Sequence, residues 1–112
     1  MSKEFYKFKV KFLKEAFQFL ETLDDKSREK VLENIRISRF KTDPKLFKKV
    51  DDKIWEFRTR YANKQLRLLA FWDKEKGSFV ICTHGLVKKS QKLPSKELNK
   101  AKKIRKIYLN QK

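Results

Sequence analysis

The residues best suited to chemistry are polar, mostly cationic side chains in three short β-rich segments of the second half of the chain. They stand among apolar neighbours or at a segment's end, where a strand has little other reason to hold them. Guanidinium groups gathered on one face of a sheet can bind and polarise a phosphodiester, so RNA is the first partner to consider. These residues are Arg58, Arg60, Arg67, His84, Lys88 and Lys89.

The arginines are expected to share one face of a sheet. Period-two alternation places Glu56, Arg58 and Arg60 on one side of the first segment, away from Trp55. If Arg67 in the next segment faces the same way, two guanidinium groups converge beside Glu56. A bidentate pair with Glu56 would then hold one guanidinium and leave the other for phosphate. For Glu56 itself the favoured interpretation is a cross-strand ion pair on a solvated face.

The third segment adds His84, the only histidine, to the same region. Its imidazole can take or give a proton near neutral pH, although a lone histidine is more often a packing or hydrogen-bonding group. Gly85 follows, where a bulge or a close backbone approach is expected. Lys88 and Lys89 either bind phosphate or end the strand as solvated charges.

Other catalytic schemes lack their residues. The single Cys82 lies in an apolar run and is expected to be a core thiol, and no His, Asp or Glu cluster has the spacing of metal ligands. We therefore expect no metal and no cofactor. What remains is attack by a ribose 2′-hydroxyl, with cations stabilising the charge on phosphate, and this chemistry acts on RNA but not on DNA.

The charge of the whole chain agrees with such a partner. The formal net charge is +17, and residues 87–112 contribute 10 − 1 = +9 of it, from ten Lys or Arg against one Glu. A cation this strong associates with nucleic acid or with acidic proteins. No signal peptide and no membrane-spanning run is evident, so a cytoplasmic protein without a membrane partner is expected. Beyond the catalytic candidates, the RNA-binding candidates are Arg60, Gln91, Lys92, Lys102, Lys103 and Arg105.

The elements that must position these residues form a single α+β domain over residues 1–112. The expected order is β-α-α-β-β-β-α: a small antiparallel sheet packed against an N-terminal helical hairpin, with a basic C-terminal helix. Asp24 or Asp25 is expected to cap the second helix, and Ser95 the last one. The expected strands cover residues 5–12, 53–61, 65–72 and 78–87, with a brief helical turn within 44–50.

Three blocks in order resemble toxins of bacterial type II toxin–antitoxin systems: WEFR, then QLRLLAFW, then VICTHGLVKKSQKLPSKELNKAKK. Within the RelE/ParE superfamily they are most similar to the HigB, or phage Gp49-like, branch. The match covers roughly the C-terminal half of the chain. The matching residues are Trp55, Glu56, Arg58, Arg67, Leu68, Phe71, His84, Gly85, Leu86, Lys88, Lys89, Gln91, Lys92, Pro94, Glu97, Leu98 and Ala101.

The resemblance implies a RelE-like toxin that cleaves mRNA on the ribosome and contacts ribosomal RNA. It also implies a cognate antitoxin, a HigA-like helix-turn-helix protein through which the pair binds operator DNA. The catalytic residues carried over are Arg58, Arg67, His84, Lys88 and Lys89, with arginine as the phosphate clamp. The division of general base and general acid between His84 and a lysine stays open.

Two other functions stay open at this point. A ParE-like inhibitor of DNA gyrase would use the same fold as a binding module without hydrolysis. A plain basic nucleic-acid-binding module would use the C-terminal helix and would tolerate the loss of single sheet arginines. An inactive remnant of a toxin is also compatible with the sequence.

Overall fold

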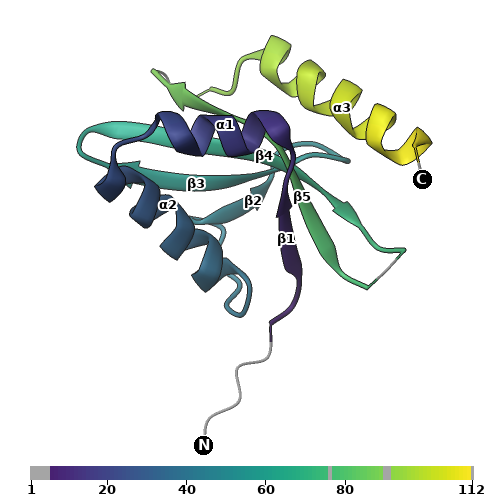
Figure 1. Ribbon diagram of the computed structural model, residues 1–112, viewed down its shortest axis with the longest axis horizontal. Coiled ribbons are helices and arrows are strands. Elements are labelled where there is room, and N and C mark those ends of the chain that lie inside the picture. Colours follow the sequence, from purple (N-terminus) through teal and green to yellow (C-terminus); the bar gives the residue numbers. More distant parts are fainter. Residues whose placement is uncertain (1–5, 76, 90–91, 112) are drawn as a thin grey trace, which may run out of the picture.

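Strands whose central members are apolar on both faces build a five-stranded sheet that carries helices on both sides (Figure 1). The computed structural model describes residues 6–75, 77–89 and 92–111. The α+β class and the basic C-terminal helix are confirmed. The elements are β1 (Lys9–Phe12), α1 (Lys14–Thr22), α2 (Asp25–Ser38), β2 (Phe47–Lys49), β3 (Trp55–Tyr61), β4 (Lys64–Asp73), β5 (Phe79–Lys88) and α3 (Ser95–Asn110).

The sheet has the order β1-β5-β4-β3-β2. The expected antiparallel meander of β3, β4 and β5 is confirmed. Two features differ from the expectation. The brief helical turn expected within 44–50 is present as a single turn, in which Phe47 N donates to Asp43 O at 3.0 Å, but the edge strand β2 follows it directly. In addition, β1 pairs with β5 in parallel. The β1–β5 pairing joins distant segments of the chain, and β2 has only three residues, so local periodicity reveals neither.

The hairpin between β3 and β4 fixes the register of the arginines. Its turn consists of Ala62 and Asn63, both with positive φ (51° and 61°). Two consecutive positive-φ residues form the kind of tight turn that matches the twist of an antiparallel pair. The hairpin then aligns Arg58 directly opposite Arg67.

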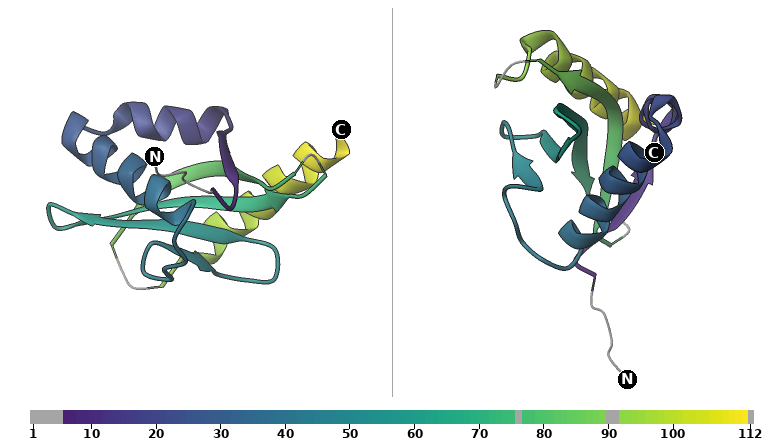
Figure 2. Two further views of the ribbon diagram at one scale, coloured as in Figure 1. Left: turned by 90° about the horizontal axis from the view of Figure 1, so that it is seen from below. Right: turned by 90° about the vertical axis from the view of Figure 1, so that its left-hand side faces the viewer.

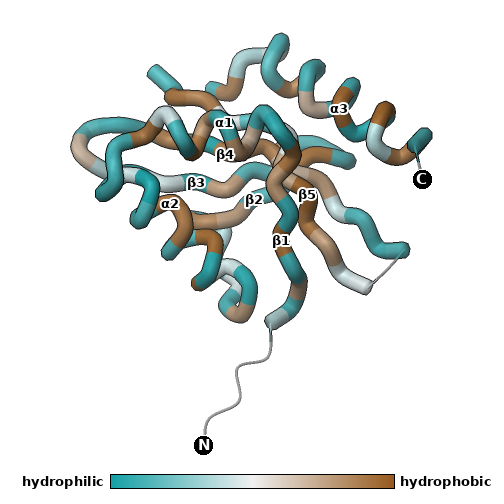
Figure 3. The backbone as a smooth tube through the Cα atoms, in the orientation of Figure 1, coloured by the Kyte–Doolittle hydropathy of each residue, from teal (hydrophilic) through white to brown (hydrophobic). Residues whose placement is uncertain are grey.

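Each face of the sheet has its own core. One core lies under α1 and α2 and includes Leu20, Val31 and Phe57, and the other lies under α3 and includes Leu69 and Ala101. Figure 2 (left) shows α1 and α2 together above the sheet. In Figure 3 the central strands carry long hydrophobic stretches, whereas α3 alternates between hydrophobic and hydrophilic turns. In the described part of the chain no helix is long and apolar enough to cross a membrane.

Side chains form hydrogen bonds with backbone groups at the ends of α1 and α2. Asp24 caps α2 as expected, since its carboxylate accepts a hydrogen bond from Ser27 N at 3.2 Å. The guanidinium of Arg28 on α2 donates to carbonyls at the end of α1, including Leu20 O at 2.8 Å. The expectation for Ser95 is corrected, because Pro94 occupies the cap position of α3.

Gly85→Ala is expected to destabilise the protein by about 1–3 kcal/mol, because an added methyl group overfills a packed interior. A Cβ at Gly85 would lie 2.1 Å from Cδ2 and 2.4 Å from Cγ of Phe19 on α1. The close approach expected at this glycine is therefore present. Chemical denaturation measures the loss, and a Phe19→Leu background is expected to reduce it; an equal loss in both backgrounds would contradict the contact.

Candidate active site

Arg58 of β3 and Arg67 of β4 form the centre of the site. They are directly opposite each other in the antiparallel ladder, and opposite residues project from the same face. The expected shared face is thus confirmed. Arg67 is 4% exposed, whereas Arg58 is half-buried. The sheet therefore holds two cations side by side, and a third group must offset their repulsion.

Glu56 is that third group. One carboxylate oxygen, Oε1, lies 3.3 Å from Nε of Arg58 and 3.4 Å from Nε of Arg67. The solvated cross-strand pair expected for Glu56 is wrong, since the side chain is only 4% exposed. The single-oxygen contact also differs from a bidentate pair, and neither Nε is aligned for a hydrogen bond. Glu56 thus offsets both charges without using up the outer guanidinium nitrogens.

Burial lowers the pKa of Arg67 from its ordinary value. The Glu56 carboxylate raises that pKa, and the neighbouring cations Arg58 and Arg60 lower it further. Arginine starts so far above neutral pH that the group stays charged. Its outer nitrogens are oriented by two acceptors: Nη2 donates to Gln65 Oε1 at 2.9 Å, and Nη1 donates to Leu66 O at 3.2 Å. The guanidinium is therefore fixed in orientation.

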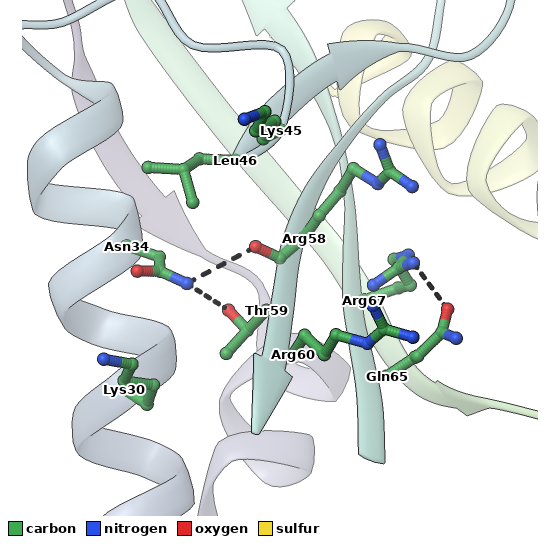
Figure 4. Close-up of a pocket in the computed structure, with 9 residues that line it drawn as sticks. All are labelled: Lys30, Asn34, Lys45, Leu46, Arg58, Thr59, Arg60, Gln65 and Arg67. Atoms are coloured by element: carbon green, nitrogen blue, oxygen red, sulfur yellow. Dashed lines mark hydrogen bonds between the residues drawn. The ribbon is translucent and has the colours of Figure 1, made fainter. Parts of the chain in front are cut away.

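These arginines border a pocket of about 480 Å³, which we call the arginine pocket (Figure 4). β2 pairs with β3 only over Trp55–Phe57, so the edge of β3 beyond that point is left for the pocket. In Figure 4 the three guanidinium groups lie on one side of β3 and α2 on the other. The lining residues are Lys30, Asn34, Lys45, Leu46, Arg58, Thr59, Arg60, Gln65 and Arg67.

The lining contains cations and, among the described residues, no carboxylate. Asn34 of α2 braces the wall: its Nδ2 donates to Thr59 Oγ1 at 3.2 Å and to Arg58 O at 3.5 Å. A pocket with several fixed guanidinium donors is suited to a bound phosphate, because such charge-assisted hydrogen bonds are strong and directional. A phosphate here would lie beside Arg58 and Arg67, with Glu56 buried behind them.

Lys88 is the fourth cation of this cluster. It lies at the end of β5 opposite Gln65 and is 7% exposed. Burial lowers the pKa of Lys88 from its ordinary value; Glu56 raises it, and Arg67, Arg58 and Lys48 lower it. The charges that act on Lys88 thus include the arginine pair and its carboxylate. Of the third-segment candidates, Lys88 is the one that the structure brings to the arginines.

His84 has different partners. Its Nδ1 lies 3.0 Å from Thr83 Oγ1, and its Nε2 lies 3.2 Å from Oε1 of Glu97 on α3. The ring is 3% exposed and stands opposite Leu69, whereas Leu86 stands opposite Arg67. The structure therefore places His84 between β5 and α3, outside the arginine pocket. This position favours a role in anchoring α3.

His84→Gln is expected to flatten the dependence of stability on pH just below 6.5, the ordinary pKa of histidine. Burial, and then the Lys100 cation, lower the pKa of His84, while Glu97 opposes the shift. The folded protein thus favours the neutral ring, so stability is full above the unfolded pKa and declines as pH falls through the folded one. Denaturation of both proteins across this window measures the slopes; equal slopes would contradict the shift.

The other RNA-binding candidates lie apart from the arginine pocket, except Arg60, which lines it. Lys102 pairs with Asp51 at 2.7 Å, so its charge is offset. Lys89, Lys92 and Lys103 are exposed, and Arg105 is half-buried on α3. Gln91 lies outside the described residues.

Sequence reasoning missed several pocket residues. Gln65 could have been found, since it precedes Arg67 by two positions and shares its face. Lys30, Asn34 and Lys45 gave no signal, because α2 and the segment before β2 meet β3 only in three dimensions. In the described part of the chain, no three His, Cys, Asp or Glu side chains group closely enough to hold a metal ion.

The family model described as phage-derived protein Gp49-like (DUF891) matches residues 18–106. This range contains α2, all of β2 to β5 and the whole arginine pocket. No curated protein matches the chain. The match extends the resemblance seen in the C-terminal half to most of the sequence, and the chain belongs to the family of Gp49-like phage-derived proteins.

Proposed function

We propose that this protein is the toxin of a type II toxin–antitoxin system and a metal-independent endoribonuclease acting on mRNA. One observation carries the proposal: Arg58 and Arg67 converge above the buried Glu56 at the edge of a basic pocket. Such an arrangement suits a phosphodiester better than a neutral ligand. Membership of the Gp49-like family and the sequence blocks shared with HigB-type toxins support the same assignment.

In the proposed reaction the 2′-oxygen of the substrate attacks the adjacent phosphorus and the bond from phosphorus to the 5′-oxygen breaks. The products are a 2′,3′-cyclic phosphate and a 5′-hydroxyl. Arg58 and Arg67 bind the non-bridging oxygens, where negative charge grows in the transition state. Donors fixed before the reaction are the most effective stabilisers of such charge. The contacts of Arg67 with Gln65 and Leu66 fix its orientation in this way.

Two titratable groups of the cluster are assigned the proton transfers. Glu56 is the carboxylate that contacts both arginines, so it is the proposed acceptor for the 2′-hydroxyl proton; because its Oε2 is buried, the half-buried Arg58 side chain has to move aside for that oxygen to reach the substrate. The Lys88 ammonium donates a proton to the leaving 5′-oxygen. Burial lowers the pKa of Lys88, which makes the ammonium a stronger acid than an exposed lysine. Lys30, Lys45 and Arg60 would bind phosphates that flank the cleaved bond.

The proposal includes two partners. Ribosome-bound mRNA is the proposed substrate, since a protein of net charge +17 associates readily with ribosomal RNA. The second partner is a HigA-like antitoxin that binds the toxin and, with it, operator DNA. Co-expression with a helix-turn-helix protein encoded beside this gene is expected to relieve growth inhibition; growth arrest that persists would remove that protein from the proposal.

Induction in a bacterium, followed by mapping of mRNA 5′ ends, tests the activity. New ends within translated codons are expected, and purified protein is expected to leave cyclic-phosphate ends on RNA in the presence of EDTA. The matched control is the double variant Arg58→Ala/Arg67→Ala. Toxicity with intact mRNA would redirect the assignment to a binding target such as DNA gyrase, and loss of cleavage in EDTA would contradict the metal-free mechanism.

A further inference from the structure

A second basic pocket lies at the other end of β2. It has a volume of about 690 Å³, within the ~300–1,000 Å³ typical of ligand sites. The arginine pocket includes Lys45 and Leu46, just before β2, and the second pocket includes Lys49, the last residue of β2. We call it the tryptophan pocket. Its lining is Lys7, Lys49, Asp52, Lys53, Trp55, Trp72, Lys74, Ser78 and Arg105.

Two tryptophans give this pocket aromatic walls. Trp55 of β3 and Trp72 of β4 have ring centroids 6.0 Å apart at an interplanar angle of 77°. Both tryptophans are half-buried, and each packs against a phenylalanine ring. The ring centroids of Trp55 and Phe47 are 4.9 Å apart, and those of Trp72 and Phe8 are 5.1 Å apart. Supported aromatic rings that border an open space are suited to stacking on a nucleobase.

The charge of the lining selects an anion. The lining contains five cations and one carboxylate, that of Asp52. Asp52 also interacts electrostatically with Lys102, which lies outside the lining. Lys74 Nζ lies 6.0 Å from the centroid of the Trp72 ring, so a cation already stands beside the aromatic wall. The pocket therefore combines aromatic rings, which can stack on a base, with cations, which can bind a phosphate. The cationic members are Lys7, Lys49, Lys53, Lys74 and Arg105.

The turn that presents these residues is held in place by α3. Asp51 Oδ1 accepts from Lys53 N at 2.8 Å and from Ile54 N at 2.9 Å. Its other oxygen pairs with Lys102 of α3 at 2.7 Å, and α3 also brings Arg105 to the pocket. The β2–β3 turn and α3 are thus joined through one carboxylate. The pocket exists before any ligand arrives, which limits the ordering cost of binding.

We propose that the tryptophan pocket binds a nucleotide of the same single-stranded RNA whose cleaved phosphate lies in the arginine pocket. Trp55 and Arg58 are three residues apart on β3, or about 10 Å along the strand. Lys48 lies between the pockets on β2, and its charge acts on Lys88. Because Trp55 and Arg58 project from opposite faces of β3, the RNA would pass over the edge strand β2 from one pocket to the other. The inference rests on the proposed function only for the identity of the ligand as RNA.

Intrinsic fluorescence tests this inference directly, because the chain has two tryptophans and both line the pocket. The probe is a short 2′-O-methyl RNA oligonucleotide, which cannot be cleaved through its 2′-oxygen. Quenching on titration is expected. An oligonucleotide of equal length with abasic sites should bind roughly tenfold or more weakly and quench little, because base stacking is lost. Equal quenching by both probes would overturn base recognition.

Charge variants locate the ligand. Lys53→Gln and Arg105→Gln are each expected to weaken quenching. Each should also reduce the slope of log affinity against log salt concentration by about 1, the value for one phosphate contact. Lys106→Gln, an exposed position of α3 outside both pocket linings, is the matched control. If all three variants bind alike, the pocket is not the site. Quenching by polyglutamate but not by RNA would instead assign the pocket to an acidic protein segment.

Failure of the inference can be separated from failure of the proposed function. Arg67→Ala is expected to slow cleavage by about 10²- to 10³-fold. Because Arg67 does not line the tryptophan pocket, quenching at saturating oligonucleotide is expected to persist, although the loss of one phosphate contact weakens binding. Cleavage by the unaltered protein without any quenching would overturn the inference alone. Quenching with the expected variant pattern, but without cleavage of unmodified RNA, would overturn the enzymatic proposal alone.

Discussion

Arg67→Ala is expected to lower the rate of RNA cleavage by about 10²- to 10³-fold, the usual cost of removing one fixed donor from the developing charge. Arg67 is suited to this role because it is 4% exposed, oriented by Gln65 and Leu66, and paired with Glu56. Single-turnover cleavage of an RNA substrate measures the chemical step. Growth inhibition on induction of the variant should fall in parallel.

The matched variant Arg67→Lys separates charge from geometry. Lysine keeps the positive charge but lacks the planar fork that binds two phosphate oxygens together. We therefore expect Arg67→Lys to remain strongly impaired. Arg36→Ala serves as the control for a lost arginine outside the arginine pocket, because Arg36 is on the exposed face of α2 beside Glu33. A fully active Arg67→Ala protein would remove this arginine from the site.

Folding must be measured beside activity, because Arg67 is also part of a buried ion pair. Thermal unfolding of Arg67→Ala and of the original protein supplies that comparison. Loss of cleavage with an intact unfolding transition supports a role in the reaction. If Arg67→Ala is unfolded at the assay temperature, Arg60→Ala tests the pocket in its place. Arg60 is exposed and lines the arginine pocket, so this change should weaken RNA binding without changing stability.

The central part of this site could be predicted from the sequence because it depends on residues that are close together in the chain. Alternation around Glu56, Arg58 and Arg67 requires only that two neighbouring strands form a hairpin. The Ala62–Asn63 turn then sets their register. Each step involves residues close together in the chain, where pattern and turn chemistry are reliable guides.

The parts that escaped prediction are too short to show a pattern or depend on distant contacts. β2 is three residues long, too short for a period-two pattern to reveal the hairpin that it forms with β3. His84 was grouped with the arginines because both lie in basic strands, but its partner Glu97 comes from α3. The burial of Glu56 likewise follows from the packing of the assembled sheet and cannot be read from strand alternation.

Glu56→Gln is expected to destabilise the protein by about 3–5 kcal/mol, because removing one partner of a buried ion pair leaves an uncompensated buried charge. Here two guanidinium groups, those of Arg58 and Arg67, lose the negative charge of the same carboxylate. Equilibrium denaturation measures the loss. Glu33→Gln is the matched control, since Glu33 pairs with Arg36 on the exposed surface of α2, where an ion pair adds little measurable stability.

A double-mutant cycle decides whether Glu56 acts through Arg67. Removing both charges in Glu56→Gln/Arg67→Gln should cost less than the sum of the two single changes, because neither charge is left without the other. Additive losses would contradict a direct coupling. Activity adds an independent measure of the proton-accepting role: Glu56→Asp keeps a carboxylate and should retain more cleavage than Glu56→Gln at equal folded fraction. Equal cleavage by the two variants would leave Glu56 as a group that only positions the arginines.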